Sequence, residues 1–154
     1  RVLEPAVASL AAQRATAVDI DLMRGILEDQ QQQIDSGSTG SEADTAFHFA
    51  MAAATHNMAL NNVFTAVEDI LHRSRAQSFQ NLGRSERSLV SHRQILEMII
   101  QRDSLKAQQA MDHHLEVVEP DVDPTWSESD SHLTTNVLKE TTDPKMREES
   151  KSGR

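Results

Sequence analysis

SEADTAFHFAMAAAT, residues 41–55, is the stretch from which the fold of this 154-residue chain is best inferred. Ser41 is followed three residues later by an acidic side chain, which is a helix-start signal. Apolar residues then recur at helical spacing, namely Phe47, Met51 and Ala54. Asp44 and His48 lie four residues apart on that same face. Because an unpaired buried charge is costly, these two side chains need a partner, and a metal ion would supply one.

The composition favours a small helical protein in a reducing compartment. Apolar residues make up 38% of the chain and charged residues 25%, which is typical of a globular domain. Four Phe, one Trp and no Tyr imply an aliphatic core, which suits helix packing. Cysteine is absent, so disulfides and thiolate metal sites are excluded, and no apolar run is long enough to span a membrane. We therefore expect a cytoplasmic protein with no membrane partner.

The charge balance limits the partners that this chain can bind directly. Its formal net charge is −9, and no cluster of Lys and Arg stands out. Nucleic acids attract basic surfaces, so we do not expect the chain itself to grip DNA. The chain opens with Arg rather than Met, and we expect it to be a fragment of a longer protein.

Helical periodicity continues along most of the chain and predicts an all-α protein. The segments are joined by short links, and no pair of credible strands occurs among them. The predicted helices are residues 2–15, 16–34, 41–54, 58–78, 86–102 and 103–119. Segments of this length with short connections pack as an antiparallel bundle, here of about six or seven helices.

The C-terminal stretch, residues 120–154, differs in character from the rest. It is acidic and polar, with Pro and Ser at its start, and carries too few apolar residues for a core of its own. At most one short helix is expected there, at residues 132–140. We therefore predict one helical domain, residues 1–119, followed by a polar tail, residues 120–154.

Three histidines and one aspartate share the apolar faces of three predicted helices. Asp44 and His48 lie on one helix, His92 falls in line with the apolar residues of a second, and His114 does so on a third. The adjacent His113 falls on a polar face instead. Each histidine taken alone could be an ordinary hydrogen-bonded core residue. Four inward groups of this type in one small bundle favour a shared metal site.

The chemistry of this set restricts the metal. Imidazoles and a carboxylate suit Zn, Ni, Fe or Mn, and the missing thiolates exclude softer choices. Three nitrogens and one oxygen leave roughly one or two coordination positions open, which indicates ligand binding or catalysis rather than a closed structural site. A ferritin-like di-metal bundle is excluded, because no Glu has a His three residues after it.

Three stretches of the chain together resemble one known family. They read RVLEPAVASLAAQRAT at residues 1–16, ADTAFHFAMAAATHN at 43–57 and SHRQILEMIIQRDSLKAQQAMDHHL at 91–115. In this pattern the chain resembles the FCD domain, the C-terminal effector-binding domain of the FadR subfamily of GntR-type transcription regulators. The resemblance covers about residues 1–119.

The resemblance implies a set of functional residues. The ligands of metal-binding FCD domains match Asp44, His48, His92 and His114. Arg1 falls at the family's opening Arg, which often meets the carboxylate of the effector, and Ser88 could hydrogen-bond the effector. Zn is the metal expected first, with Ni, Mn or Fe as alternatives. The effector would be a small carboxylate or 2-hydroxy acid, such as lactate, pyruvate, glycolate, citrate or a sugar acid.

The resemblance also implies partners beyond this chain. Family members carry an N-terminal winged helix-turn-helix that binds DNA, and this chain would begin after it. DNA would therefore be bound only through that absent domain, and the regulator would be a homodimer.

Three other functions compete with a metal-dependent sensor. A metal enzyme with a site of three histidines and one aspartate would need a general acid or base beside the metal, and no spare inward group is evident. A metal-free helical interaction module would treat the same four residues as core polar groups. A fatty-acyl pocket, which other FCD domains use, is disfavoured because those members lack the four ligands.

Overall fold

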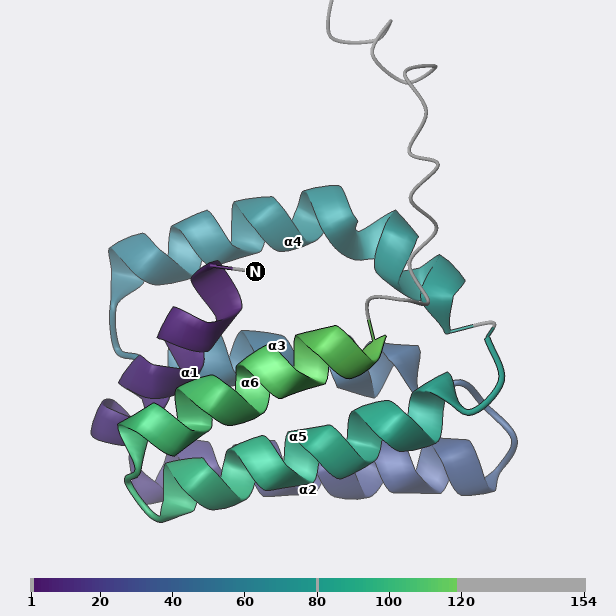
Figure 1. Ribbon diagram of the computed structural model, residues 1–154, viewed down its shortest axis with the longest axis horizontal. Helices are drawn as coiled ribbons and strands as arrows, with labels where there is room; N and C mark the ends of the chain where they lie inside the picture. The colour runs from purple at the N-terminus through teal and green to yellow at the C-terminus, as the bar shows by residue number, and fades with distance from the viewer. Residues whose placement is uncertain (1, 80, 119–154) are drawn as a thin grey trace, which may run out of the picture. The chain divides into compact units, whose positions relative to one another are not determined.

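The computed structural model is all-helical throughout the residues that it describes, 2–79 and 81–118, which confirms the predicted fold class. The helices are α1 (Leu3–Arg14), α2 (Ala17–Asp35), α3 (Ser41–Ala53), α4 (Met58–Ser78), α5 (Arg84–Ile100) and α6 (Ser104–Val118) (Figure 1). None of these helices is both long enough and apolar enough to cross a bilayer. The predicted tail, with its possible short helix, lies outside the described residues.

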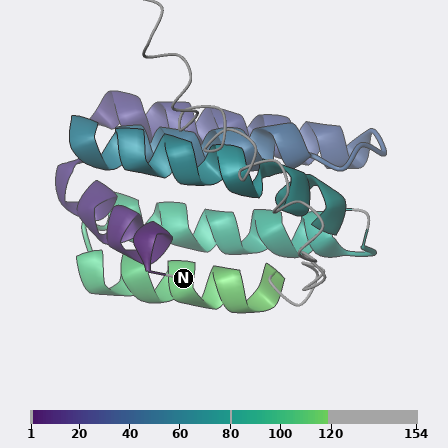
Figure 2. The same cartoon turned by 90° about the horizontal axis from the view of Figure 1, so that it is seen from above.

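The helices form an antiparallel bundle that α1 crosses obliquely. From α2 to α6, each helix runs opposite to the one before it (Figure 1). Seen from above, α5 and α6 lie side by side (Figure 2). α1 packs against α6, α5 and α3, while α2 packs against α3 and α5. Residues from the first helix of the chain therefore reach the same interior as residues from the last described helix.

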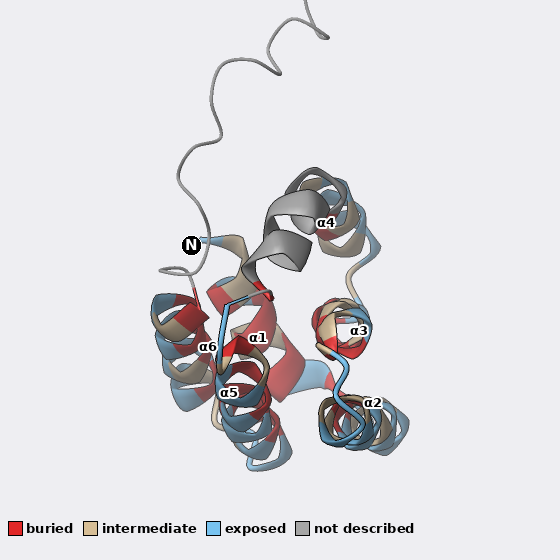
Figure 3. Ribbon diagram, turned by 90° about the vertical axis from the view of Figure 1, so that its right-hand side faces the viewer, coloured by how far each residue is buried: buried red, intermediate tan, exposed pale blue. Residues whose placement is uncertain are grey.

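Small side chains on α1 allow this close crossing. Buried faces of the helices turn toward one another (Figure 3), and the buried face of α1 includes Val7, Ala8, Ala11 and Ala12. Val7 and Ala11 are fully buried, as the periodicity predicts, whereas Leu10 is only half-buried. Ala8 and Ala12 take the buried positions beside them. Alanine lets a neighbouring backbone approach, so Leu10 is left at the edge of the contact.

The start of α3 differs from its predicted form. Ser41 is the first helical residue and does not cap the helix; Gly40 precedes it with a positive φ of 67°. A Cβ at Gly40 would come within 3.2 Å of the Gln30 side chain, so the close approach of α2 also favours glycine there. Asp44 is therefore not part of a capping box, and its carboxylate is buried in the core.

The fifth helix also begins earlier than predicted. α5 starts at Arg84 rather than residue 86, after Gly83 in the left-handed conformation with φ 73°. The Arg84 guanidinium is buried and lies 4.3 Å from the centre of the Phe79 ring. Gly83 is the N-cap of the helix, and the spacing of apolar residues does not mark such a cap.

A capping box does occur at the start of α2. The Thr16 hydroxyl accepts a hydrogen bond from the Asp19 backbone N–H, and the Asp19 carboxylate accepts one from the Thr16 backbone N–H at 2.7 Å. His56, in the break before α4, places its Nε2 2.9 Å from the same carboxylate. Partial burial raises the pKa of Asp19, but the hydrogen bonds from Thr16 and His56 outweigh it and lower the pKa below its ordinary 3.8.

We expect Asp19→Ala to lower the free energy of unfolding by about 1 kcal/mol at neutral pH, as loss of a helix cap does. Because the folded pKa is lowered, the carboxylate stabilises the fold above the ordinary pKa and loses this effect as the pH falls through the lowered value. Urea unfolding at several pH values should show the difference between the two proteins shrinking in acid. Asp29→Ala, at an exposed position of the same helix, should change little. A difference that stays constant with pH would contradict this assignment.

Candidate metal centre

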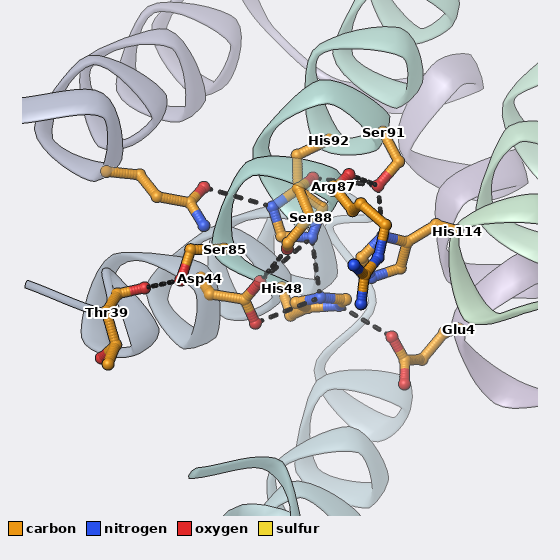
Figure 4. Close-up of polar contacts among 11 residues, drawn as sticks. Glu4, Thr39, Asp44, His48, Ser85, Arg87, Ser88, Ser91, His92 and His114 are labelled. Atoms are coloured by element: carbon orange, nitrogen blue, oxygen red, sulfur yellow. Dashed lines mark hydrogen bonds and ion pairs between the residues drawn. The ribbon is translucent and has the colours of Figure 1, made fainter. Parts of the chain in front are cut away.

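The structure brings together the four side chains that helical periodicity placed on inward faces. Asp44 and His48 come from α3, His92 from α5 and His114 from α6 (Figure 4). The first three are fully buried and His114 is 1% exposed. One ligand atom from each histidine lies within 4.8 Å of the other two. Three helices thus deliver a carboxylate and three imidazoles to one enclosed point.

Inside this centre, the Nε2 atoms of two histidines lie close to each other and to the Asp44 carboxylate. His48 Nε2 lies 3.1 Å from His92 Nε2. Asp44 Oδ2 lies 3.9 Å from His48 Nε2, and Asp44 Oδ1 lies 3.6 Å from His92 Nε2. Two nitrogens bound to one metal at about 2.0–2.1 Å would be about 2.9–3.4 Å apart, depending on the coordination geometry. The separation of the two imidazoles is therefore that of neighbouring ligands.

Each ligand has a second partner on its outer side. His48 Nδ1 lies 2.7 Å from Glu4 Oε2, and His92 Nδ1 lies 3.4 Å from Gln30 Oε1. A third contact of this kind joins His114 Nδ1 to the Ser91 hydroxyl at 2.7 Å. The Asp44 carboxylate accepts a short hydrogen bond from the Ser88 hydroxyl. These outer partners come from α1, α2 and α5, so five of the described helices contribute to the centre.

The outer contacts show which ring nitrogen faces away from the centre. Nδ1 of His48 lies beside the Glu4 carboxylate, and Nδ1 of His92 can donate to the Gln30 oxygen. Ser91 has one hydroxyl hydrogen, and its oxygen also lies 2.9 Å from the carbonyls of Arg87 and Ser88. We assign that hydrogen to the backbone, which makes Ser91 the acceptor from His114. Nε2 of His48 and Nε2 of His92 are thus turned toward each other and toward Asp44.

The electrostatic environment keeps His114 neutral. Burial lowers the pKa of His114 well below its ordinary 6.5, and the neighbouring His92 and His48 lower it further. A neutral imidazole is the form that binds metals. Three such nitrogens beside a buried carboxylate repel one another unless a cation lies between them. The donor set therefore fits a divalent metal ion of the zinc, nickel, iron or manganese type.

Two outer partners were missed by the sequence analysis. Gln30 was given no role from the sequence, yet it is fully buried against His92. Glu4 received no role of its own. Both follow the buried spacing of their helices: Gln30 comes three residues after Leu27, and Glu4 comes three residues before Val7. The same face analysis that selected the histidines could have found them.

Of the two residues predicted to contact the effector, the structure describes Ser88 but not Arg1. Ser88 is fully buried beside the centre, with its hydroxyl donating to Asp44. Arg1 lies outside the described residues. The opening pattern of the resembling family is Arg-x-x-Leu-Glu, with two residues between Arg and Leu, whereas this chain has only Val2 between Arg1 and Leu3. Contact of either residue with an effector stays a prediction.

The fold and the centre define a class: a helical domain with a buried carboxylate–imidazole site suited to a divalent ion. Residues 1–117 match the family model of the FCD domain, and the chain belongs to this family.

Two curated relatives agree with this assignment. The chain is 34% identical over 126 residues to the Uxu operon transcriptional regulator of Escherichia coli (strain K12), covering 77% of this chain and 49% of that protein. It is 29% identical over 124 residues to the HTH-type transcriptional regulator LutR of Bacillus subtilis (strain 168), covering 77% and 57%. Both are GntR-family transcription regulators. The chain spans about half the length of these relatives.

Proposed function

We propose that this chain is the effector-sensing domain of a GntR-family transcription regulator, with a divalent metal ion held by Asp44, His48, His92 and His114. The observation that carries the proposal is the arrangement of the imidazoles. Each Nδ1 has a partner on the outer side, while Nε2 of His48 and of His92 lie near the Asp44 carboxylate. Zn is the first choice of metal, and Ni, Mn or Fe are alternatives.

A small carboxylate or 2-hydroxy acid is the effector that suits such a centre. A metal held by four protein ligands keeps open positions when its coordination number exceeds four, and a carboxylate and an adjacent hydroxyl can then occupy them together. Lactate, pyruvate, glycolate, citrate and sugar acids share this chemistry. Arg1 would meet the carboxylate with its guanidinium, and Ser88 would meet the effector only by sharing its hydroxyl between it and Asp44.

Sensing requires that the effector bind two arrangements of the bundle unequally. The centre joins side chains from α3, α5 and α6, so a ligand bound there can favour one packing of these helices over another. The DNA-binding segment would be a separate N-terminal domain, as in a longer regulator, and the whole would act as a homodimer in the cytoplasm. An acidic sensing domain leaves DNA contact to that other domain.

A metal enzyme is the alternative with the same ligand set, and we propose that this chain is not one. A hydrolytic site would need a general base beside an open coordination position. Glu4 is the nearest additional carboxylate with a described contact to the centre, and that contact is to the outer nitrogen of His48. An incubation of the loaded protein with hydroxy acids should return them unchanged, whereas turnover would favour the enzyme.

The first test is elemental analysis of the purified chain, followed by melting with and without a chelator. We expect about one Zn, Ni, Mn or Fe per chain and a lower melting temperature after stripping, because a metal bound only by the native state stabilises it. Hydroxy acids should then raise the melting temperature of the metal-loaded protein and leave that of the stripped protein unchanged. Absence of metal, together with no uptake of added Zn or Ni, would contradict the proposal and favour a metal-free helical module.

A further inference from the structure

We propose that Glu4 is a positioning residue that couples the metal centre to helix α1. This inference rests on the proposed function, because it concerns what a bound metal would do to the rest of the bundle. Glu4 lies in the first turn of α1, whereas the ligand that it contacts, His48, lies on α3. The contact therefore ties the first described helix directly to the centre.

The geometry makes this contact a strong one. Glu4 Oε2 lies 2.7 Å from His48 Nδ1, and the two side chains are 13% and 0% exposed. A contact shielded from water is weakened little by solvent or salt. The carboxylate lies beside Nδ1 of His48, while Nε2 of the same ring lies 3.1 Å from His92 Nε2. Glu4 thereby contacts the outer edge of this ligand and helps to fix the orientation of its ring.

The chemical type of its side chain distinguishes Glu4 from the other outer partners of the histidines. Gln30 and Ser91 have neutral side chains, whereas Glu4 ends in a carboxyl group. A cation at Nε2 withdraws electron density from the imidazole, which strengthens the attraction between Nδ1 and a neighbouring carboxylate. Occupancy of the centre should therefore tighten the Glu4 contact more than the other two.

A tighter contact has a consequence for α1. This helix packs on α6, α5 and α3 largely through small residues, such as Ala8 and Ala11, so few long side chains hold it in place. A metal-dependent link at its first turn would hold α1 more firmly against α3. Coupling is reciprocal, so a displacement of α1 that breaks this contact would also weaken metal binding. In the proposed regulator, α1 would be the helix nearest in sequence to the DNA-binding domain.

The experiment compares backbone amide exchange in α1, with and without Zn²⁺, in the full 154-residue chain. The variants are Glu4→Gln, which keeps the shape and removes the charge, and Glu4→Ala, which removes both. The matched control is Glu42→Gln. Glu42 is exposed and lies in the first turn of α3, the helix that carries Asp44 and His48. Zn²⁺ affinity is measured by competition with a chromophoric chelator, and Co²⁺ absorption reports the ligand set.

We expect Zn²⁺ to slow exchange in α1 of the unmodified chain and of Glu42→Gln. In Glu4→Gln, affinity should fall roughly 10–100-fold, as loss of an outer partner does, with the Co²⁺ spectrum still that of four protein ligands. At saturating Zn²⁺, exchange in α1 should no longer slow in Glu4→Gln or in Glu4→Ala.

The proposal is overturned if either variant keeps the unmodified affinity, or if saturating Zn²⁺ still slows α1 exchange in both. Either result would leave the metal centre itself intact. If the unmodified chain takes up neither Zn²⁺ nor Co²⁺, the proposed function fails together with this inference.

Discussion

Zinc is expected to stabilise the unmodified chain and the His113→Ala variant but not the His114→Ala variant. At a zinc concentration about 100 times the dissociation constant, binding to the native state alone adds about 2.7 kcal/mol to the free energy of unfolding. His114 is 1% exposed within the proposed centre, whereas the side chain of His113 is 60% exposed on the other face of α6. Urea unfolding of each protein, with and without zinc, measures this increment.

His113 is a closely matched control for His114. Both substitutions remove one imidazole from α6, and the two positions are adjacent in the chain. His114→Ala also leaves a space in the core, so the informative quantity is the increment caused by zinc rather than the stability itself. A zinc increment that survives in His114→Ala, or one that disappears equally in both variants, would refute His114 as a ligand.

Phe47→Ala should cost the metal-free fold about 3–5 kcal/mol, the usual loss for a fully buried phenylalanine. Phe47 is fully buried on α3, and its ring stacks on His92 with centroids 4.5 Å apart. The substitution removes both the apolar burial and one wall of the centre. Since small domains are stable by only about 5–15 kcal/mol, the variant would be close to unfolding at room temperature.

A second substitution keeps this prediction testable if Phe47→Ala does not fold. Phe47→Leu retains most of the apolar volume and should cost clearly less, while losing the stack on His92. Leu82→Ala is the control, because Leu82 is 98% exposed, and it should change stability by less than about 0.5 kcal/mol. Losses at residue 47 no larger than at residue 82 would show that Phe47 does not support the core as described.

Much of the fold follows from local patterns in the sequence. Short links separate segments whose apolar residues repeat at helical spacing, and the described helices match those segments closely. The starts of α3 and α5 were the exceptions. Gly40 lies close to a neighbouring helix, and Arg84 follows Gly83, which caps α5 in the left-handed conformation. Neither influence lies within the segment itself.

The inward direction of His48, His92 and His114 was equally a property of the sequence. On a helix the spacing from neighbouring apolar residues fixes the face of a side chain, whatever the helix packs against. Glu4 and Gln30 obey the same spacing, but only histidines and Asp44 were assigned to buried faces from the sequence. A test of every polar residue against the buried face would have included both of them.

The sequence by itself determined the helices, their buried faces and the four side chains available to a metal, because each depends on residues a few positions apart. Only the tertiary structure decided that Glu4 meets His48 and that Gln30 meets His92. Those pairings depend on how α1 and α2 cross the other helices, and the crossing is set by the packing of the whole core. The same packing turns Nδ1 of each histidine toward its outer partner and brings Nε2 of His48 close to Nε2 of His92.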